Sequence, residues 1–344
     1  MKKINTLLSF LLFGAISITA QNIEWGDETK MDTLSYASGV NVAYGMNQQF
    51  GYTPFDYEIL EKAVSNSALG IATLEEDSTT LTKEQIPGIL NDYFGEKYPD
   101  RLKAGKASLD SLKVYDEKNY LMSRMFETQI ERTLVSKAFG MNLGASINKS
   151  AMPVKVYWVL QGMRDMREGK AIMSNAEAMN CINYYMNVTR VENLKKQSSE
   201  WIASVAQMKG VKVLPSGLLY KIDKKGNSKQ MPLTNETEVT VHYKGSKADG
   251  TVFDATRFTD MPPARQEEMK RYNPNGYDKN DPISFALNRV IAGWTEGLKL
   301  IGKGGKITLW IPYNLAYGER GAGGVIAPYE ALRFDIELID VKNK

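Results

Sequence analysis

The last third of the chain consists of short segments in which polar and apolar residues alternate, and this pattern constrains the fold more than any other. The alternating segments are residues 237–243, 306–311 and 332–341, and glycine-rich stretches at 302–305 and 321–324 separate them. A period of two is typical of strands that bury one face, and glycine clusters are typical of turns. One short helix fits over residues 294–301. We therefore predict a twisted antiparallel sheet wrapped on one short helix.

The same region contains an ordered set of apolar and aromatic residues. Each of them, taken alone, is more typical of an ordinary core than of a site. Together, in this order and with flanking glycines, they indicate a pocket on the concave face of the predicted sheet. The set is Val241-His242-Tyr243, Phe253-Asp254, Val290-Ile291-Ala292-Gly293-Trp294, Ala316-Tyr317-Gly318, Ile326 and Phe334.

In that order, the set resembles the active-site pocket of FKBP-type peptidyl-prolyl cis/trans isomerases, over roughly residues 214–342. The resemblance implies an FKBP-like domain that catalyses rotation about X-Pro bonds without a cofactor. This rotation crosses a barrier of about 18–20 kcal/mol because amide resonance must be broken. A dry aromatic trough should favour the twisted amide, which is less charge-separated than the planar one. About 1.4 kcal/mol of preferential stabilisation gives a tenfold gain in rate.

The resemblance also implies roles for individual side chains. Trp294 would lie under the proline ring, and Asp254 would act electrostatically on the twisted amide while a tyrosine hydroxyl, that of Tyr243, orients it. The backbone N–H of Ile291 and the hydroxyl of Tyr317 would hold substrate carbonyls. The alternative role for Asp254 is to cap a turn after a strand. The implied catalytic residues are Tyr243, Asp254 and Tyr317, and the implied substrate-binding residues are Phe253, Ile283, Val290, Ile291, Trp294, Ile326 and Phe334.

The sequence departs from the family pattern in three places. Leu315 stands where many members have an aromatic residue, and Ala322 stands where some carry a histidine. The third departure is an insert of residues 257–281, in which the charged run 265–271 could form two helical turns. Because the insert leaves from the rim of the predicted pocket, it would gate the site or extend the peptide groove; the alternative is a solvated surface elaboration.

The first residues have the pattern of a secretory signal peptide. Lys2 and Lys3 precede an almost wholly apolar run, residues 7–18, and Ala20 provides a small residue at the cleavage point. The run is shorter than the about twenty residues that a helix needs to cross a bilayer. No cysteine follows it closely, which argues against lipid attachment. We expect an exported, soluble protein, most simply periplasmic, without an integral membrane segment after cleavage; the alternative is an N-terminal core helix.

Composition excludes several kinds of chemistry. The formal charge is only +3 and no dense basic stripe is present, so nothing supports a nucleic-acid partner. One histidine, His242, and one cysteine, Cys181, cannot form a His/Cys metal site or an intrachain disulfide. Because His242 lies in a predicted strand beside the pocket, we interpret it as structural. No phosphate-binding glycine loop is present.

Residues 22–212 have helical patterns and contain an internal duplication, which makes the fold class α+β. Thr82 with Gln85, and Ser174 with Glu177, form capping-box patterns at matching places. An extra loop is expected at residues 73–80 of the first copy, and Cys181 matches Ile89, which indicates a buried small hydrophobe. The matching segments are 37–42 with 138–143, 62–70 with 161–169, and 89–93 with 181–185.

Each copy resembles the helical domain that precedes the isomerase domain in envelope proteins of the macrophage infectivity potentiator type, most closely at Leu160-Gln161-Gly162-Met163-Arg164-Asp165. In that family one such domain dimerises by interleaving helices with a second chain. Two copies in one chain therefore predict an intrachain pseudo-dimer and a monomeric protein. The predicted domains are a signal peptide at 1–20, helical repeats at 21–125 and 126–212, and an isomerase domain at 213–344.

Two functions are compatible with the sequence. The first is an exported prolyl isomerase that assists folding of envelope proteins, with proline-containing unfolded or partly folded polypeptides as partners. The second is a weakly active or inactive chaperone or scaffold that binds unfolded clients through its helical region. The retained Tyr243, Asp254, Trp294, Tyr317 and Phe334 favour the first.

Overall fold

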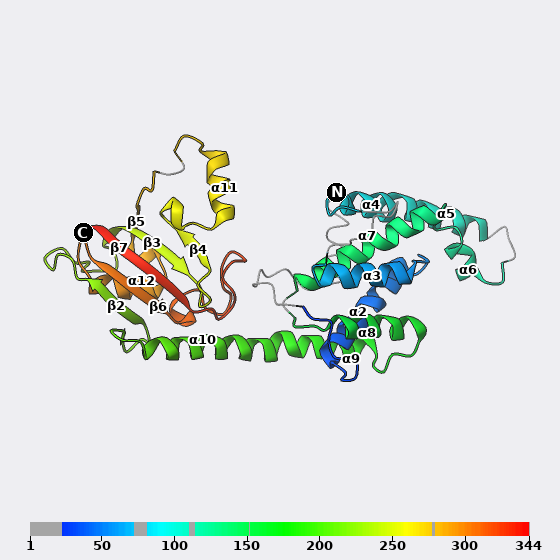
Figure 1. Ribbon diagram of the computed structural model, residues 1–344, viewed down its shortest axis with the longest axis horizontal. Coiled ribbons are helices and arrows are strands. Elements are labelled where there is room, and N and C mark those ends of the chain that lie inside the picture. Colours follow the sequence, from blue (N-terminus) through cyan, green and yellow to red (C-terminus); the bar gives the residue numbers. More distant parts are fainter. Residues whose placement is uncertain (1–22, 72–80, 110–113, 151, 277–278, 344) are drawn as a thin grey trace. The chain divides into compact units, whose positions relative to one another are not determined.

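The computed structural model describes residues 23–71, 81–109, 114–150, 152–276 and 279–343. The chain divides into two units, residues 1–187 and 188–344 (Figure 1). The predicted signal peptide and the predicted extra loop at 73–80 lie outside the described residues. The unit boundary falls near the end of the second helical repeat, before the junction helix.

The helical region contains the same order of elements twice, which confirms the duplication. Each set includes a π-helical turn at the matching place, and such turns are rare enough to argue against coincidence. The first set is α2 (Thr33–Phe50), α3 (Tyr57–Ala68), α4 (Ile86–Asp92), η1 (Tyr93–Lys97) and α5 (Tyr98–Leu109). The second set, after α6 (Glu117–Met122), is α7 (Gln129–Asn148), α8 (Val156–Glu168), α9 (Asn175–Tyr184), η2 (Tyr185–Thr189) and α10 (Arg190–Ala206).

Helices of one set pack against helices of the other. Helix α2 packs against α8 and α9, and helix α7 packs against α3 and α4. Buried residues from both sets form one hydrophobic core, including Val40, Leu60, Phe139 and Val159. Each first helix therefore completes the core of the opposite set, so the two repeats are interleaved within the chain.

Glycines allow the close approach of these helices. A Cβ atom on Gly39 of α2 would lie 2.0 Å from the carbonyl oxygen of Val159 in α8. A Cβ atom on the matching Gly140 of α7 would lie 2.4 Å from the carbonyl oxygen of Leu60 in α3. The two crossings therefore share one geometry, in which backbone packs directly against backbone.

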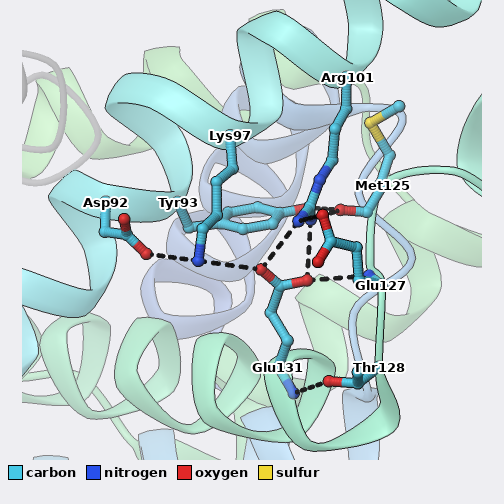
Figure 2. A network of polar contacts seen from close by, with 8 residues as sticks. All are labelled: Asp92, Tyr93, Lys97, Arg101, Met125, Glu127, Thr128 and Glu131. Atoms are coloured by element: carbon cyan, nitrogen blue, oxygen red, sulfur yellow. Dashed lines mark hydrogen bonds and ion pairs between the residues drawn. The ribbon is translucent and has the colours of Figure 1, made fainter.

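A polar network joins the first set to the start of α7 (Figure 2). Arg101 of α5 donates to both carboxylate oxygens of Glu131, at 2.8 and 3.2 Å, and to the carbonyl of Met125 at 2.6 Å. Burial opposes ionisation of Glu131, but Arg101, the backbone N–H of Glu127 and Lys97 together outweigh burial and lower the pKa of this carboxyl. Glu131 also lies in the first turn of α7, where Thr128 caps the helix and a negative charge is favoured.

The structure confirms only part of what was predicted for individual positions in the helices. Ser174 and Glu177 form the predicted capping box at the start of α9. At the matching place in the first set, the Gln85 side chain accepts from the Thr82 N–H at 2.8 Å, but α4 begins later, at Ile86, with a proline in its first turn. Cys181 is only partly buried; burial raises its pKa, which keeps the thiol protonated.

The second unit contains the predicted antiparallel sheet on one short helix. The strands are β1 (Lys212–Val213), β2 (Leu219–Lys224), β3 (Glu238–Ser246), β4 (Val252–Ala255), β5 (Ile283–Ala286), β6 (Lys306–Ile311) and β7 (Leu332–Lys342). They pair in the order β1-β2-β6-β7-β3-β4. Helix α12 (Ala292–Gly297), continued by the 3-10 turn η5 (Leu298–Leu300), packs on β6, where Gly293 and Gly297 meet Ile311 and Leu309.

The predicted insert connects two strands that share one edge of the sheet. Strand β5 pairs with residues 238–241 of β3, and β4 pairs with residues 244–246 of the same strand. Between them lie the 3-10 turn η3 (Phe258–Asp260) and helix α11 (Pro263–Tyr272), shown in yellow in Figure 1. The predicted helical turns are therefore present, and the insert leaves the pairing of the sheet intact.

We expect Gly39→Ala to destabilise the helical unit by about 1–3 kcal/mol, because its Cβ atom would force two backbones apart. Gly88→Ala in α4 is the control, since its Cβ atom would have no neighbour within 4 Å; it should be neutral or stabilising by up to about 1 kcal/mol. Urea unfolding of the full chain measures both. Equal stability of Gly39→Ala and wild type would show that the helices do not cross here.

Candidate active site

The register of β3 and β7 places the aromatic residues of the predicted pocket on one face of the sheet. Tyr243 lies opposite Ile336, and Gly245 lies opposite Phe334. Because side chains alternate along a strand, these positions face the same side. Trp294, in the first turn of α12, packs into the same core as Phe334. Sheet and helix thus hold the aromatic rings from two directions.

A cavity of about 380 Å³ lies at this place. Its lining joins residues of β3, β4, β5 and β7 to residues before and within α12 and to one loop tyrosine. The lining residues are Tyr243, Phe253, Asp254, Ile283, Phe285, Arg289, Val290, Ile291, Trp294, Tyr317 and Phe334.

Edge-to-face contacts fix the aromatic rings of this pocket. The ring of Trp294 lies 5.1 Å from those of both Tyr243 and Phe334, nearly perpendicular to each. Phe253 meets Phe334 edge-on at 5.6 Å. Gly245 makes room for this pair, because a Cβ atom there would lie 2.6 Å from the Phe253 ring and 2.8 Å from the Phe334 ring. These contacts give the pocket a rigid apolar floor.

The polar groups of the pocket lie at its rim. The hydroxyl of Tyr243 donates a hydrogen bond to the carboxylate of Asp254. No backbone N–H within the described ranges donates to this carboxylate, so the structure favours the orienting tyrosine over a turn-capping role. Burial, followed by the hydrogen bond to Asp254, raises the pKa of Tyr243, and burial, followed by the charge of Asp254, raises the pKa of Tyr317. Both hydroxyls therefore remain hydrogen-bond donors at neutral pH.

The structure brings together nine of the ten predicted site residues. Ile326 is the exception: it is 7% exposed and belongs to the core of the unit, not to the pocket lining. Two hydrogen bonds between the backbones of Ala322 and Ile326, at 3.0 and 2.9 Å, turn this loop back on itself. The glycine-rich sequence indicates a turn here but does not determine which way Ile326 faces.

Two lining residues were missed. Phe285 lies two residues after Ile283 in β5, so strand alternation could have placed it on the same face. Its ring lies 5.4 Å from that of Trp294. Arg289 lines the rim from an exposed turn before Val290, and no residue spacing identifies it.

His242 lies on the opposite face of the sheet from the pocket. It alternates with Tyr243 along β3, and its Nδ1 atom lies 3.1 Å from the Thr256 hydroxyl. Desolvation, and then the charge of Arg257, lowers its pKa. This placement agrees with a structural role.

The insert begins and ends beside the pocket but is anchored away from it. Asp254 precedes the insert and Ile283 follows it, and both line the pocket. The first residues of the insert hold to the opposite face through Arg257 with Glu337 at 2.7 Å and Lys244 with Asp260 at 3.6 Å. None of the described insert residues, 257–276 and 279–281, lines the pocket.

Comparison with known proteins identifies the family. The family model described as "FKBP-type peptidyl-prolyl cis-trans isomerase" matches residues 229–339. The isomerase FkpA of Buchnera aphidicola (Schizaphis graminum) is 34% identical over 232 residues, which cover 62% of this chain and 83% of the relative. The chain belongs to the FKBP-type peptidyl-prolyl cis/trans isomerases.

Other matches extend over the helical region. The model of the domain amino-terminal to FKBP-type isomerases matches residues 132–222, which include most of the second helical set. The macrophage infectivity potentiator of Trypanosoma cruzi is 38% identical over 170 residues, covering 49% of this chain and 70% of the relative. FkpA of Escherichia coli K12 is 42% identical over 146 residues, covering 42% of this chain and 46% of that protein. The predicted resemblance to this group is confirmed.

We expect Tyr243→Phe to lower kcat/KM for a short X-Pro peptide about tenfold, because Asp254 loses the group that orients it while the ring contacts remain. Tyr220→Phe in β2, outside the pocket lining, is the control and should leave kcat/KM unchanged. Magnetisation-exchange NMR on the peptide measures both, without a coupled protease. A wild-type kcat/KM for Tyr243→Phe would show that this hydrogen bond does not contribute to catalysis.

Proposed function

We propose that this protein is an exported peptidyl-prolyl cis/trans isomerase that assists folding of envelope proteins. The observation that carries the proposal is the aromatic pocket with Trp294 as its floor and the Tyr243–Asp254 pair at its rim. The signal-peptide pattern at residues 1–20 supports export. No helix in the described ranges is long and apolar enough to cross a bilayer.

The proposed mechanism needs no proton transfer and no covalent step. The proline ring of the substrate rests on Trp294, which is 5% exposed, among the aromatic rings of the pocket. As the amide twists, resonance is lost and charge separation falls, so the apolar pocket stabilises the twisted state relative to the planar one. Asp254, fixed by the Tyr243 hydroxyl, acts on the twisted amide from the rim.

Two donors are positioned for substrate carbonyls. The backbone N–H of Ile291 precedes α12, and within the described part of the chain it donates to no other group. The hydroxyl of Tyr317 stays protonated and is partly exposed at the pocket. We assign both groups to holding the peptide while the X-Pro bond rotates.

We also propose that the protein is a monomer in solution. In the helical unit, each first helix already packs on the opposite set of the same chain. Helices of the same chain thus occupy the interface that a second chain would otherwise supply.

The proposal predicts that an Asp254→Ala/Trp294→Ala double variant loses about 100-fold in kcat/KM, equivalent to about 3 kcal/mol of transition-state stabilisation. The substrate is a short X-Pro peptide, and Lys229→Ala, at an exposed position outside the pocket lining, is the control. Circular dichroism checks that each variant is folded. Equal activity of the double variant and wild type would refute the pocket as the active site.

The same assay shows whether the insert gates the pocket. Because the described insert residues do not line the pocket, a chain shortened between residues 259 and 278 should keep its kcat/KM on the short peptide within about twofold. Activity that emerges only after shortening would establish a gate. Inactivity of wild type, shortened chain and double variant alike would favour the chaperone or scaffold function.

A further inference from the structure

The two glycine crossings of the helical unit differ at one end. Where α7 meets α3, a Cβ atom on Gly144 would lie 2.4 Å from the carbonyl oxygen of Val64. Ser67 donates to the carbonyl of Met141, and Asn148 donates to the carbonyl of Ala68, each at 2.7 Å. Small residues and hydrogen bonds therefore close this crossing.

At the matching end of the α2–α8 crossing, larger residues replace the small ones. The duplication aligns Ala43 with Gly144, Met166 with Ser67 and Arg167 with Ala68. The structure has a cavity of about 380 Å³ here, which α6 and the segment after α2 complete. The two copies thus differ in the size of these side chains, and the cavity lies at the end of the α2–α8 crossing, which has the larger ones.

The interior of this cavity is apolar and adaptable. Its apolar lining includes Met46, Phe50, Phe55, Met122, Met163 and Met166. Flexible thioethers can repack around ligands of different shape, which suits a site that takes more than one side chain. The volume is in the range of about 300–1,000 Å³ that is typical of ligand sites.

The mouth of the cavity is cationic. Lys118 and Arg167 line it, and an adjoining hollow of about 500 Å³ shares Lys118 and adds Lys106. Among the described residues, no carboxylate lines either space. Glu61 and Glu168, which lie outside the lining, pair with Arg167 at 3.2 and 3.6 Å, and Glu61 also pairs with Arg164 at 2.7 Å. The positive charge that a ligand would meet is therefore chiefly that of Lys118 and Lys106.

We propose that this cavity binds an unfolded polypeptide segment in which a bulky apolar side chain lies beside an acidic residue. The assignment rests on the proposed action on unfolded clients and adds a binding site to it, separate from the isomerase pocket. The apolar side chain enters the methionine-lined interior, and the carboxylate meets Lys118. Two adjoining hollows with a shared wall suit successive side chains of an extended chain.

The test is fluorescence anisotropy of the mature full-length protein with a labelled, proline-free ten-residue peptide that carries two Phe-Glu pairs. A peptide without proline does not address the isomerase mechanism. Replacing Glu by Lys in the peptide should weaken binding about tenfold, and replacing Phe by Ser should abolish it. Affinity should also fall with rising salt, because the rim interaction is screened.

Two variants of the protein locate the site. Ala43→Leu fills the cavity and should weaken peptide binding about tenfold, and Lys118→Glu should weaken it about fivefold. The controls are Ala203→Leu and Lys149→Glu, which make the same changes at exposed positions outside both hollows. Thermal unfolding confirms folding of Ala43→Leu, and Lys118→Glu provides a surface change if that variant fails.

The outcomes separate the two proposals. X-Pro isomerisation should stay at the wild-type rate in both cavity variants. Equal affinity of variants and controls, indifference to the Glu-to-Lys exchange, or binding of laurate but not of peptide would overturn the cavity proposal. Loss of isomerase activity in the Asp254→Ala/Trp294→Ala variant with unchanged peptide affinity would support both. An inactive wild type that still binds the peptide at this cavity would overturn the isomerase proposal alone.

Discussion

Direct backbone packing at the glycine crossings is the constraint on which the helical unit depends. Because Gly39 and Gly140 let each first helix approach the opposite set, neither repeat encloses a core by itself. The Arg101–Glu131 network adds a polar connection between the sets at the start of α7. One chain thereby contains both halves of an interface that two identical repeats would form. The halves have diverged at the end of one crossing, where the methionine-lined cavity lies.

In the isomerase unit, different contacts hold the pocket and the insert. The rings that form the pocket are held by β3, β7 and α12. Strands β3 and β7 pair with each other, and residues of all three elements share one core. The insert joins β4 to β5 along one edge of β3 and is anchored on the face away from the pocket. The described residues of the insert therefore add nothing to the walls of the pocket beside it.

Much of this arrangement could be predicted from the sequence, because period-two alternation defines strands and the order of aromatic residues defines a family. The repeat also survives in sequence, since Gly39 and Gly140 cannot be enlarged without separating helices. Other features depend on tertiary context. Whether Ile326 faces the pocket is decided by backbone pairing with Ala322, and the placing of Arg289 is decided by a turn. Cys181 matches a predicted core position yet is only partly buried, because helix periodicity does not show how far a neighbouring helix reaches.

The interleaving of both repeats within one chain can be checked by multi-angle light scattering of the mature protein over a wide concentration range. We expect the mass of one chain at every concentration, because the surfaces that would join two chains are already paired within one. A stable mass of two chains would refute the proposed monomer.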